Sequence, residues 1–216
     1  MRMRRKKHGQ ERLSACGELI LPESITPSDE IFGNTAPVHL EIGCGKGDFV
    51  CGMAEKHPDI NFIAIERISD VLMLAAEKVK AKGLKNVRLA VMNAANLAER
   101  ITPHSIERIY LNFSDPWPKK GYAKRRLTYK AFLDIYKTLL EENGSIFVKT
   151  DDIGLYEFSL TELSENGFTI TDKTTDLHAS EYANDNVMTE YERIFTSSGK
   201  KINMLRAYLK GDSGNE

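Results

Sequence analysis

The stretch VHLEIGCGKGDF, residues 38–49, indicates how this 216-residue chain folds. It begins as a short apolar run, which predicts a buried strand, and is then interrupted by Gly43, Gly45 and Gly47. Glycine tolerates positive φ and lets a ligand approach the backbone closely, and a helix is expected to begin near Asp48. Strand, glycine turn and helix start together indicate a backbone cradle for a nucleotide-type ligand. An ordinary tight turn between a strand and a helix is the alternative.

The spacing of the glycines and the carboxylate of Glu41, two residues before the first glycine, limit which kinds of ligand the loop can bind. A nicotinamide site of the GxGxxG type needs a glycine at position 48, where this chain has Asp48. Glu41 places a carboxylate at the end of the strand, which would repel a pyrophosphate but suits a cationic amino-acid head group. The EIGCGKG run therefore resembles motif I of the class I S-adenosylmethionine-dependent methyltransferases. The resemblance implies S-adenosyl-L-methionine as the cofactor.

Composition predicts a single α/β domain, because the length suffices for one substantial core and no shift in composition marks a second. The 30 Lys and Arg residues balance 31 Asp and Glu residues, so any argument for nucleic-acid binding depends on where the charges cluster. Cys16, Cys44 and Cys51 form no CxxC pair, which predicts reduced thiols, a cytoplasmic protein and no metal site. No run of about 18 apolar residues predicts a membrane span, and the N-terminus lacks the apolar core of a signal peptide.

The first 12 residues carry six basic side chains and a single acidic one, Glu11. We expect residues 1–18 to be a basic, mobile arm, residues 19–210 to form the domain, and residues 211–216 to be a tail. The arm is either simply solvated or a contact for phosphates. The sequence leaves open whether the protein is a monomer or a homodimer.

Beyond the glycine loop, apolar runs alternate with helical spacings, as in a doubly wound sheet. The pattern predicts later strands at residues 61–66, 87–92, 106–113, 145–151, 168–176 and 191–197, and helices at residues 48–57, 69–82, 128–142 and 156–166. The resemblance to class I methyltransferases implies a Rossmann-like, seven-stranded, mostly parallel sheet of order 3-2-1-4-5-7-6, with the last strand antiparallel.

Three further residues, at the ends of two predicted strands, are candidates for cofactor binding. Glu66 ends the second predicted strand, where an acid in a doubly wound sheet faces the ligand crevice and can accept hydrogen bonds from a ribose. A solvated glutamate at a strand end is the alternative. Asn93 and Ala94 follow the third strand, where the resembling family usually has an aspartate that bonds the adenine amino group. The amide oxygen of Asn93 can still accept from that amine.

The second informative stretch is SDPWPKK, residues 114–120, which follows the fourth predicted strand. In a sheet of order 3-2-1-4-5 the first and fourth strands are neighbours, so both loops open onto the same crevice and Asp115 is expected to meet the cofactor. Pro116 and Pro118 restrict the backbone and favour a stiff, extended turn. Asp115 is our candidate catalytic residue; the alternative is that it only shapes the loop.

Basic residues then gather beside the same crevice. Six of the twelve residues 119–130 are basic: Lys119, Lys120, Lys124, Arg125, Arg126 and Lys130. Such clustering indicates a contact surface for a phosphate backbone, with a purely solvated loop as the alternative.

The run NFSDPWPKKGYAKRR closely resembles the signature of the bacterial tRNA (guanine-N7)-methyltransferases, and the resemblance extends to FVKTDD and TEYE downstream. It covers essentially the whole chain. It implies transfer of a methyl group from S-adenosylmethionine to N7 of a tRNA guanine, at position 46 in the variable loop. It also implies substrate contacts at Lys119, Asp151, Thr189, Tyr191 and Glu192, and RNA contacts at Gly121, Tyr122, Ala123, Lys124, Arg125 and Arg126.

Some alternatives stay open at the level of sequence. A hydroxyl and a carboxylate in TEYE can read a base edge or merely cap an edge strand. A methyltransferase of a small molecule or a protein would keep the glycine loop without needing the basic cluster. A methyltransferase of another RNA is a further alternative. A non-catalytic RNA-binding module would keep the basic cluster without needing Glu41 or Glu66.

Overall fold

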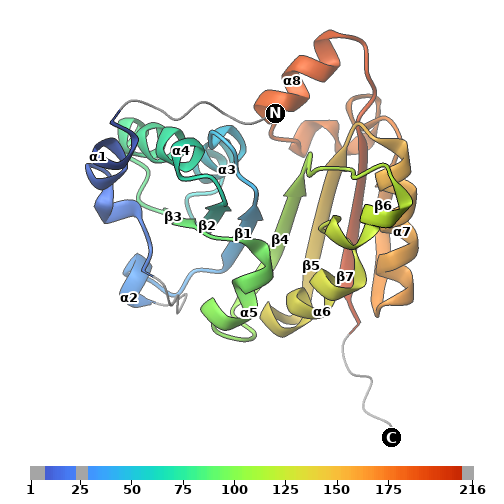
Figure 1. The fold of residues 1–216 in the computed structure, drawn as a ribbon, viewed down its shortest axis with the longest axis horizontal. Coiled ribbons are helices and arrows are strands. Elements are labelled where there is room, and N and C mark those ends of the chain that lie inside the picture. Colours follow the sequence, from blue (N-terminus) through green and yellow to red (C-terminus); the bar gives the residue numbers. More distant parts are fainter. Residues whose placement is uncertain (1–7, 23–28, 211–216) are drawn as a thin grey trace, which may run out of the picture.

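A computed structural model describes residues 8–22 and 29–210 of the chain. Its centre is one seven-stranded sheet with helices on both faces (Figure 1). The strands are β1 (Val38–Ile42), β2 (Asn61–Glu66), β3 (Val87–Val91), β4 (Ile106–Asn112), β5 (Leu140–Thr150), β6 (Phe168–Thr174) and β7 (Asn203–Leu209). The α-helices are α1 (Gly9–Ser14), α2 (Asp29–Phe32), α3 (Asp48–Lys56), α4 (Ser69–Lys82), α5 (Leu97–Arg100), α6 (Lys130–Leu139), α7 (Ile153–Glu165) and α8 (Glu190–Ser197). Short 3₁₀ helices are η1 (Gly17–Leu19), η2 (Ala94–Asn96), η3 (Lys120–Arg125), η4 (Leu177–Ala179) and η5 (Glu181–Asp185).

The strand order is β3-β2-β1-β4-β5-β7-β6, which confirms the predicted order. The strands β1 to β5 pair in parallel, and β7 lies antiparallel between β5 and β6. In a parallel sheet the carboxyl ends of the strands lie along one edge, and order reverses between β1 and β4. The loops after β1 and β4 therefore open side by side.

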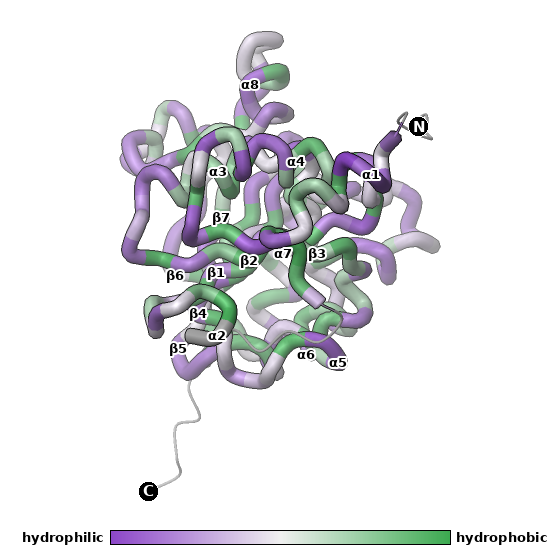
Figure 2. The backbone as a smooth tube through the Cα atoms, turned by 90° about the vertical axis from the view of Figure 1, so that its left-hand side faces the viewer, coloured by the Kyte–Doolittle hydropathy of each residue, from purple (hydrophilic) through white to green (hydrophobic). Residues whose placement is uncertain are grey.

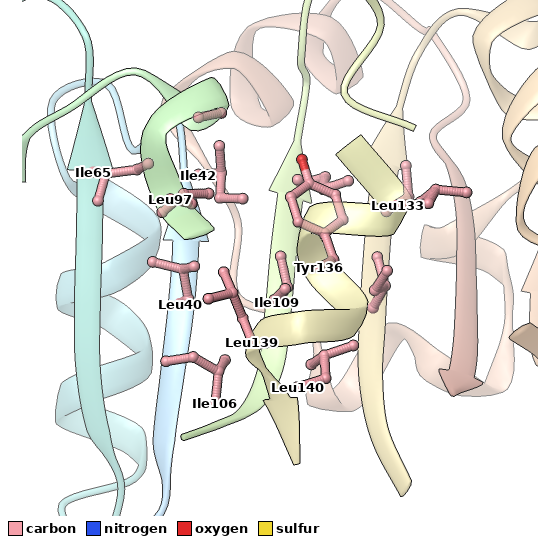
Figure 3. Close-up of a cluster of buried hydrophobic side chains, with 14 of the residues drawn as sticks. Leu40, Ile42, Ile65, Leu97, Ile106, Ile109, Leu133, Tyr136, Leu139 and Leu140 are labelled. Atoms are coloured by element: carbon pink, nitrogen blue, oxygen red, sulfur yellow. The ribbon is translucent and has the colours of Figure 1, made fainter. Parts of the chain in front are cut away.

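Two apolar layers hold the helices to the sheet. On one face, residues of α5, α6 and α7 pack with β1, β4 and β5, and Figure 3 shows Leu40, Ile109 and Tyr136 within this layer. On the other face, α3 and α4 pack against β2, β3 and Tyr110 of β4. Figure 2 shows a hydrophobic segment of the backbone at β3. The side chains of a strand alternate between faces, so Glu41 points away from the layer that contains Leu40.

The strand expected at residues 191–197 is wrong, because this segment forms the helix α8. Thr189 is its N-cap and Glu192 its third residue, and the two form a complete capping box. This reciprocal pair satisfies backbone N–H groups at a helix start, so it favours a helix here. The closing strand is instead β7, which pairs with neighbours on both sides.

The N-terminal region differs from the expected arm over residues 8–18. Arg12 of α1 makes two hydrogen bonds to Glu77 of α4, at 2.7 and 2.6 Å. Cys16 is buried, and the N–H of Leu21 donates to the Leu89 carbonyl at 2.8 Å beside β3. Residues 8–22 therefore pack on the domain. The remainder of the expected arm, residues 1–7, and the expected tail, residues 211–216, lie outside the described residues.

A smaller correction concerns the junction of α6 and β5. The helix expected over residues 128–142 ends at Leu139, and the strand expected from residue 145 begins at Leu140. Leu140 pairs with Ile106 of β4, and the register then shifts before Arg108 pairs with Ser145. Asn143 has a φ of 62° in this irregular part of the strand.

Candidate functional site

The glycine loop after β1 has the backbone that its sequence predicts. Gly43, Gly45 and Gly47 have φ values of 80°, 54° and 77°, which side chains other than glycine rarely adopt. A Cβ on Gly47 would lie 2.8 Å from the Cβ of Ala75, so this glycine lets α3 and α4 pack closely. A Cβ on Gly43 or Gly45 would meet no atom within 4 Å. The first part of the loop is therefore open to a ligand.

Glu41 and Asn112 form an acceptor-rich pair at the ends of β1 and β4. Glu41 is buried, and Nδ2 of Asn112 donates to its Oε1 at 3.1 Å. Glu41 Oε2 and Asn112 Oδ1 are also buried, and neither has a hydrogen-bond partner among the described residues. Burial raises the pKa of Glu41 to about 7, although the Asn112 hydrogen bond opposes this. Two buried acceptors without a donor fit a cationic amino group.

Sequence reasoning missed Asn112. The available signal was its place as the last residue before FSDPW, on a strand expected beside the one that carries Glu41. A polar residue at the end of a buried strand costs stability unless something bonds it. Asn112 therefore belongs with Glu41 in the candidate cofactor site.

Glu66 and Asn93 lie at the ends of two paired strands. The N–H of Gly45 donates to Glu66 Oε2 at 3.3 Å, and the N–H of Ile68 donates to Oε1 at 3.0 Å. The Met92 N–H donates to the Glu66 carbonyl at 3.0 Å, which brings the start of the Asn93 loop to this edge. Each carboxylate oxygen can accept a further bond, as a ribose diol requires.

The exposed Asn93 has a structural task as well. Its Oδ1 accepts from the N–H of Ala95 at 3.1 Å, which makes it the N-cap of η2, and Ala94 beside it is buried. An amide oxygen has a second lone pair, so the cap leaves one acceptor position open for an adenine amine.

The loop that carries Asp115 is held in a strained conformation. Phe113 and Trp117 have φ values of 53° and 43°, which is uncommon for bulky side chains. Arg126 Nε donates to the Pro116 carbonyl at 2.9 Å, and Nη2 donates to the Trp117 carbonyl at 3.2 Å. Asp115 itself is exposed and makes no hydrogen bond or ion pair with any residue in the described ranges. Its carboxylate is free to meet a ligand.

The basic residues after this loop divide into two kinds. Lys119, Lys120 and Lys124 are exposed. Within the described part of the chain, no carboxylate pairs with these three lysines. Arg125 lies 4.8 Å from the ring centres of both Trp117 and Tyr122.

Arg126 differs from the lysines because it is half-buried. Its guanidinium stacks 4.3 Å from the ring of Phe158 while it bonds the carbonyls of the Asp115 loop. These contacts give Arg126 the task of holding the loop. Gly121 and Tyr122 are exposed on η3, and Ala123 is half-buried.

The TEYE residues build the start of α8, which stands beyond the carboxyl edge of the sheet (Figure 1). Thr189 is buried as the N-cap, whereas Tyr191 is 59% exposed. Glu192 is fully buried, and its carboxylate accepts from Thr189 N–H at 3.3 Å and Lys149 Nζ at 2.8 Å. Of the four residues, Tyr191 is the one that faces solvent most fully. Asp151, at the end of β5, is half-buried and pairs with Lys200 at 2.7 Å.

The described ranges contain no group of three or more His, Cys, Asp or Glu side chains arranged to hold a metal ion. Within residues 8–22 and 29–210, no helix is long and apolar enough to cross a bilayer.

The sheet order and the glycine loop define the class of protein, a class I methyltransferase fold. A solved 16S rRNA methyltransferase is 17% identical, with a TM-score of 0.63 over 85% of this chain and 94% of that one. Haemonchus contortus phosphoethanolamine N-methyltransferase 2, solved with S-adenosyl-L-methionine, is 15% identical, with a TM-score of 0.52 over 82% of this chain and 50% of that one. At these identities the likeness concerns the fold alone.

Sequence comparison identifies the family. The family model described as "Putative methyltransferase" matches residues 35–205. The tRNA (guanine-N(7)-)-methyltransferase of Streptococcus agalactiae serotype III is 46% identical over 96% of this chain and 99% of its own length. The protein of the same name from Geobacillus kaustophilus is 45% identical over 94% of each chain, and that from Brevibacillus brevis is 49% identical over 82% of this chain and 83% of its own. The chain belongs to the bacterial tRNA (guanine-N7)-methyltransferase family, as its SDPWPKK signature predicts.

Proposed function

We propose that this enzyme transfers the methyl group of S-adenosyl-L-methionine to N7 of a guanine in tRNA, at position 46 of the variable loop. The observation that carries the proposal is the arrangement at β1 and β4. The two unpaired acceptors of Glu41 and Asn112 lie beside the glycine loop, and Asp115 and the unpaired lysines follow Asn112 within the same segment. One edge of the sheet thus offers both a cofactor site and a polyanion site.

The residues present fit S-adenosylmethionine, which supplies a methyl group on a sulfonium sulfur. Glu41 and Asn112 would hold its amino group, because their buried acceptors need a donor. The open backbone at Gly43 and Gly45 leaves room for it. Glu66 would accept from the ribose, and Asn93 and Ala94 would lie at the adenine. A pyrophosphate-containing cofactor would meet the Glu41 carboxylate and be repelled.

The main task of the protein in this reaction is to orient the guanine relative to the methyl group. Guanine N7 carries an in-plane lone pair and no proton, so no general base is required. Holding a nucleophile in line with its target contributes up to roughly 7 to 11 kcal/mol in well-oriented systems. The strained loop at Phe113 and Trp117, fixed by Arg126, is suited to this because a rigid backbone aims its side chains.

Asp115 acts on the charge that develops during transfer. As N7 is alkylated, positive charge moves onto the imidazole ring of the guanine, so a nearby carboxylate stabilises the transition state more than the ground state. At about 4 Å and an effective dielectric near 20, such a pair is worth at most about 4 kcal/mol before desolvation. The exposure of Asp115 supports a ligand contact more than a purely structural task.

The substrate residues divide by what they contact. Lys119 and Tyr191 are exposed and would touch the tRNA directly. Asp151 would bind the substrate after exchanging its pair with Lys200. Thr189 and Glu192 would contribute through the backbone of α8 that they form. In η3, Lys124 and Arg125 would meet phosphates or bases.

The compartment follows the same reasoning. Cys16, Cys44 and Cys51 are buried free thiols, which supports a reducing cytoplasm, where tRNA is modified.

A single incubation separates the candidate functions. The protein is mixed with radiolabelled S-adenosylmethionine and unmodified tRNA, the RNA is digested, and 7-methylguanosine is separated by chromatography. A transcript with adenine at position 46 serves as the control and should remain unlabelled. Label that enters another RNA, a small molecule or a protein would favour a methyltransferase of different substrate. Binding of tRNA without transfer would favour an RNA-binding module.

A further inference from the structure

Lys149 is a buried ammonium group that the proposed chemistry does not use. It lies on β5 with 6% of its surface exposed. Its Nζ donates to Asn186 Oδ1 at 2.9 Å, to the Val187 carbonyl at 2.8 Å and to Glu192 Oε2 at 2.8 Å. An ammonium has three N–H donors, so all of them are used on residues 186–192. We call residues 186–192 the recognition segment, because it contains TEYE.

The partner of Lys149 is equally enclosed. Glu192 has no exposed surface, and its second oxygen, Oε1, accepts from Asn186 Nδ2 and lies 3.1 Å from His178 Nε2. Burial lowers the pKa of Lys149, while the carboxylates of Glu192 and Glu41 oppose that shift. Breaking such a pair from one side leaves a buried charge without compensation, whereas removing both charges is often tolerated.

The recognition segment also packs on α3, the helix that follows the glycine loop. A Cβ on Gly52 would lie 2.6 Å from Val187 Cγ1, so glycine is needed for this close packing. Lys46, within the glycine loop, pairs with Glu190 at 2.7 Å. The recognition segment is therefore held by contacts with β5, with α3 and with the glycine loop.

The backbone of Lys149 holds a second element. Its carbonyl accepts from the N–H of Phe113 at 2.8 Å, and Phe113 is the first residue of the loop that carries Asp115. The ring centres of Phe113 and Phe195 lie 6.0 Å apart, and Phe195 belongs to α8 with Tyr191. Lys149 thus contacts the Asp115 loop through its main chain and the recognition segment through its side chain.

We propose that Lys149 is a positioning residue, which fixes the recognition segment and Tyr191 relative to the Asp115 loop so that tRNA meets a preformed surface. The part concerning tRNA rests on the proposed function. The part concerning the fixed segment does not, because it concerns the free protein. A misplacement of about 1 Å can cost about 100-fold in rate, so the expected kinetic effect of releasing the segment is large.

The test compares Lys149→Met, the neutral pair Lys149→Met/Glu192→Gln, and Lys137→Met as a control for a half-buried lysine on α6 that pairs with Asp134 at the surface. Glutamine keeps an acceptor for the Thr189 N–H, so the pair retains the helix cap. Amide hydrogen exchange of residues 186–197 is measured beside melting temperature, S-adenosylhomocysteine affinity and kinetics on tRNA. We expect the melting temperature of Lys149→Met to be lower than that of the wild type, and the melting temperature of the double variant to recover most of this loss. In both, exchange in the recognition segment should rise at least tenfold, with little change in β1.

The kinetic expectation is specific to positioning. In the neutral pair, kcat/KM for tRNA should fall by about 100-fold with a fall in kcat as well as a rise in KM, while S-adenosylhomocysteine affinity stays within about threefold. Recovery of both exchange and kcat/KM in the pair would show that Lys149 only balances a charge and would overturn the proposal. Slower kinetics with unchanged exchange would also overturn it, because that pattern indicates a direct contact. A wild-type protein inactive on tRNA would refute the proposed function but leave the exchange result standing.

Discussion

Asn112 Nδ2 donates to Glu41 Oε1 across 3.1 Å, and the remaining acceptor of each side chain is buried without a donor. The two residues are far apart in the chain and meet because β1 and β4 are neighbours in the sheet. A carboxylate in this position is costly to ionise until a cation arrives. In the proposed cofactor site, the pair therefore links cofactor binding to the stability of the free protein.

Replacing Glu41 with Gln should change how stability depends on pH. The pKa of Glu41 rises from 4.5 to about 7 in the folded protein, so the folded state holds a proton that the unfolded state has released. Its stabilising contribution is complete below pH 4.5 and is lost as pH rises through about 7. A shift of this size corresponds to about 3 kcal/mol. We therefore expect urea unfolding without cofactor to show that, between pH 4.5 and 8, the free energy of unfolding of the Gln variant rises by about this amount relative to that of the wild type. A difference that does not vary with pH would contradict the buried, proton-holding Glu41.

Replacing Glu66 with Ala should weaken binding of S-adenosylhomocysteine by about 1.5 to 3 kcal/mol, the range for hydrogen bonds to a charged group. The change also removes the acceptor for the N–H groups of Gly45 and Ile68, so the backbone around the site loses two hydrogen bonds. Calorimetry measures the affinity, and the exposed Glu157→Ala on α7 is the matched control. Tight binding of NAD together with no heat from S-adenosylhomocysteine would end this reading of the site.

Replacing Asp115 with Asn keeps the shape of the side chain and removes its charge. If the carboxylate stabilises cationic charge on the guanine ring, single-turnover methylation should slow by about two to three orders of magnitude, or about 2.7 to 4 kcal/mol. The affinity for tRNA should hardly change. Asp59→Asn, in an exposed turn, is the control. A near wild-type rate at saturating S-adenosylmethionine would leave Asp115 as a residue that only shapes its loop.

The wild-type rate should show no basic limb that belongs to a catalytic base, because guanine N7 needs no deprotonation. A pH profile of single-turnover methylation tests this expectation. A limb that disappears in the Asp115→Asn variant would instead assign proton transfer to Asp115.

Lys124 and Arg126 should affect tRNA binding differently. Lys124 is exposed and unpaired among the described residues, so Lys124→Ala should reduce the log-log salt slope of tRNA affinity by roughly 0.7 to 0.9. Arg126 is occupied by two loop carbonyls and the ring of Phe158. Arg126→Ala should therefore slow single-turnover methylation more than it changes the slope.

Binding titrations at several salt concentrations measure the slope, with Lys85→Ala as the exposed control on another part of the domain. An unchanged slope in Lys124→Ala would refute the proposed phosphate contact. A slope reduced by Arg126→Ala as much as by Lys124→Ala would show that Arg126 also binds phosphate.

The sequence by itself predicted the parts of the protein that depend on local chemistry. Three alternating glycines after an apolar run require positive φ, and the structure has it at Gly43, Gly45 and Gly47. Alternating strand and helix signals with the methyltransferase resemblance predicted the sheet order and the antiparallel last strand. The capping box of Thr189 and Glu192 was also present in the sequence as a helix signal. The strand predicted there was wrong because the prediction gave more weight to the apolar residues of the segment than to this signal.

The tertiary structure decided which polar side chains work together. Asn112 meets Glu41, and Lys149 meets Glu192, because neighbouring strands and a distant helix bring them into contact inside the fold. Arg126 belongs to the same group, since its guanidinium donates to the carbonyl of Pro116, ten residues earlier in the chain. Local patterns fix backbone conformation within a few residues, whereas the partner of a buried charge depends on long-range packing, which no short stretch of sequence specifies.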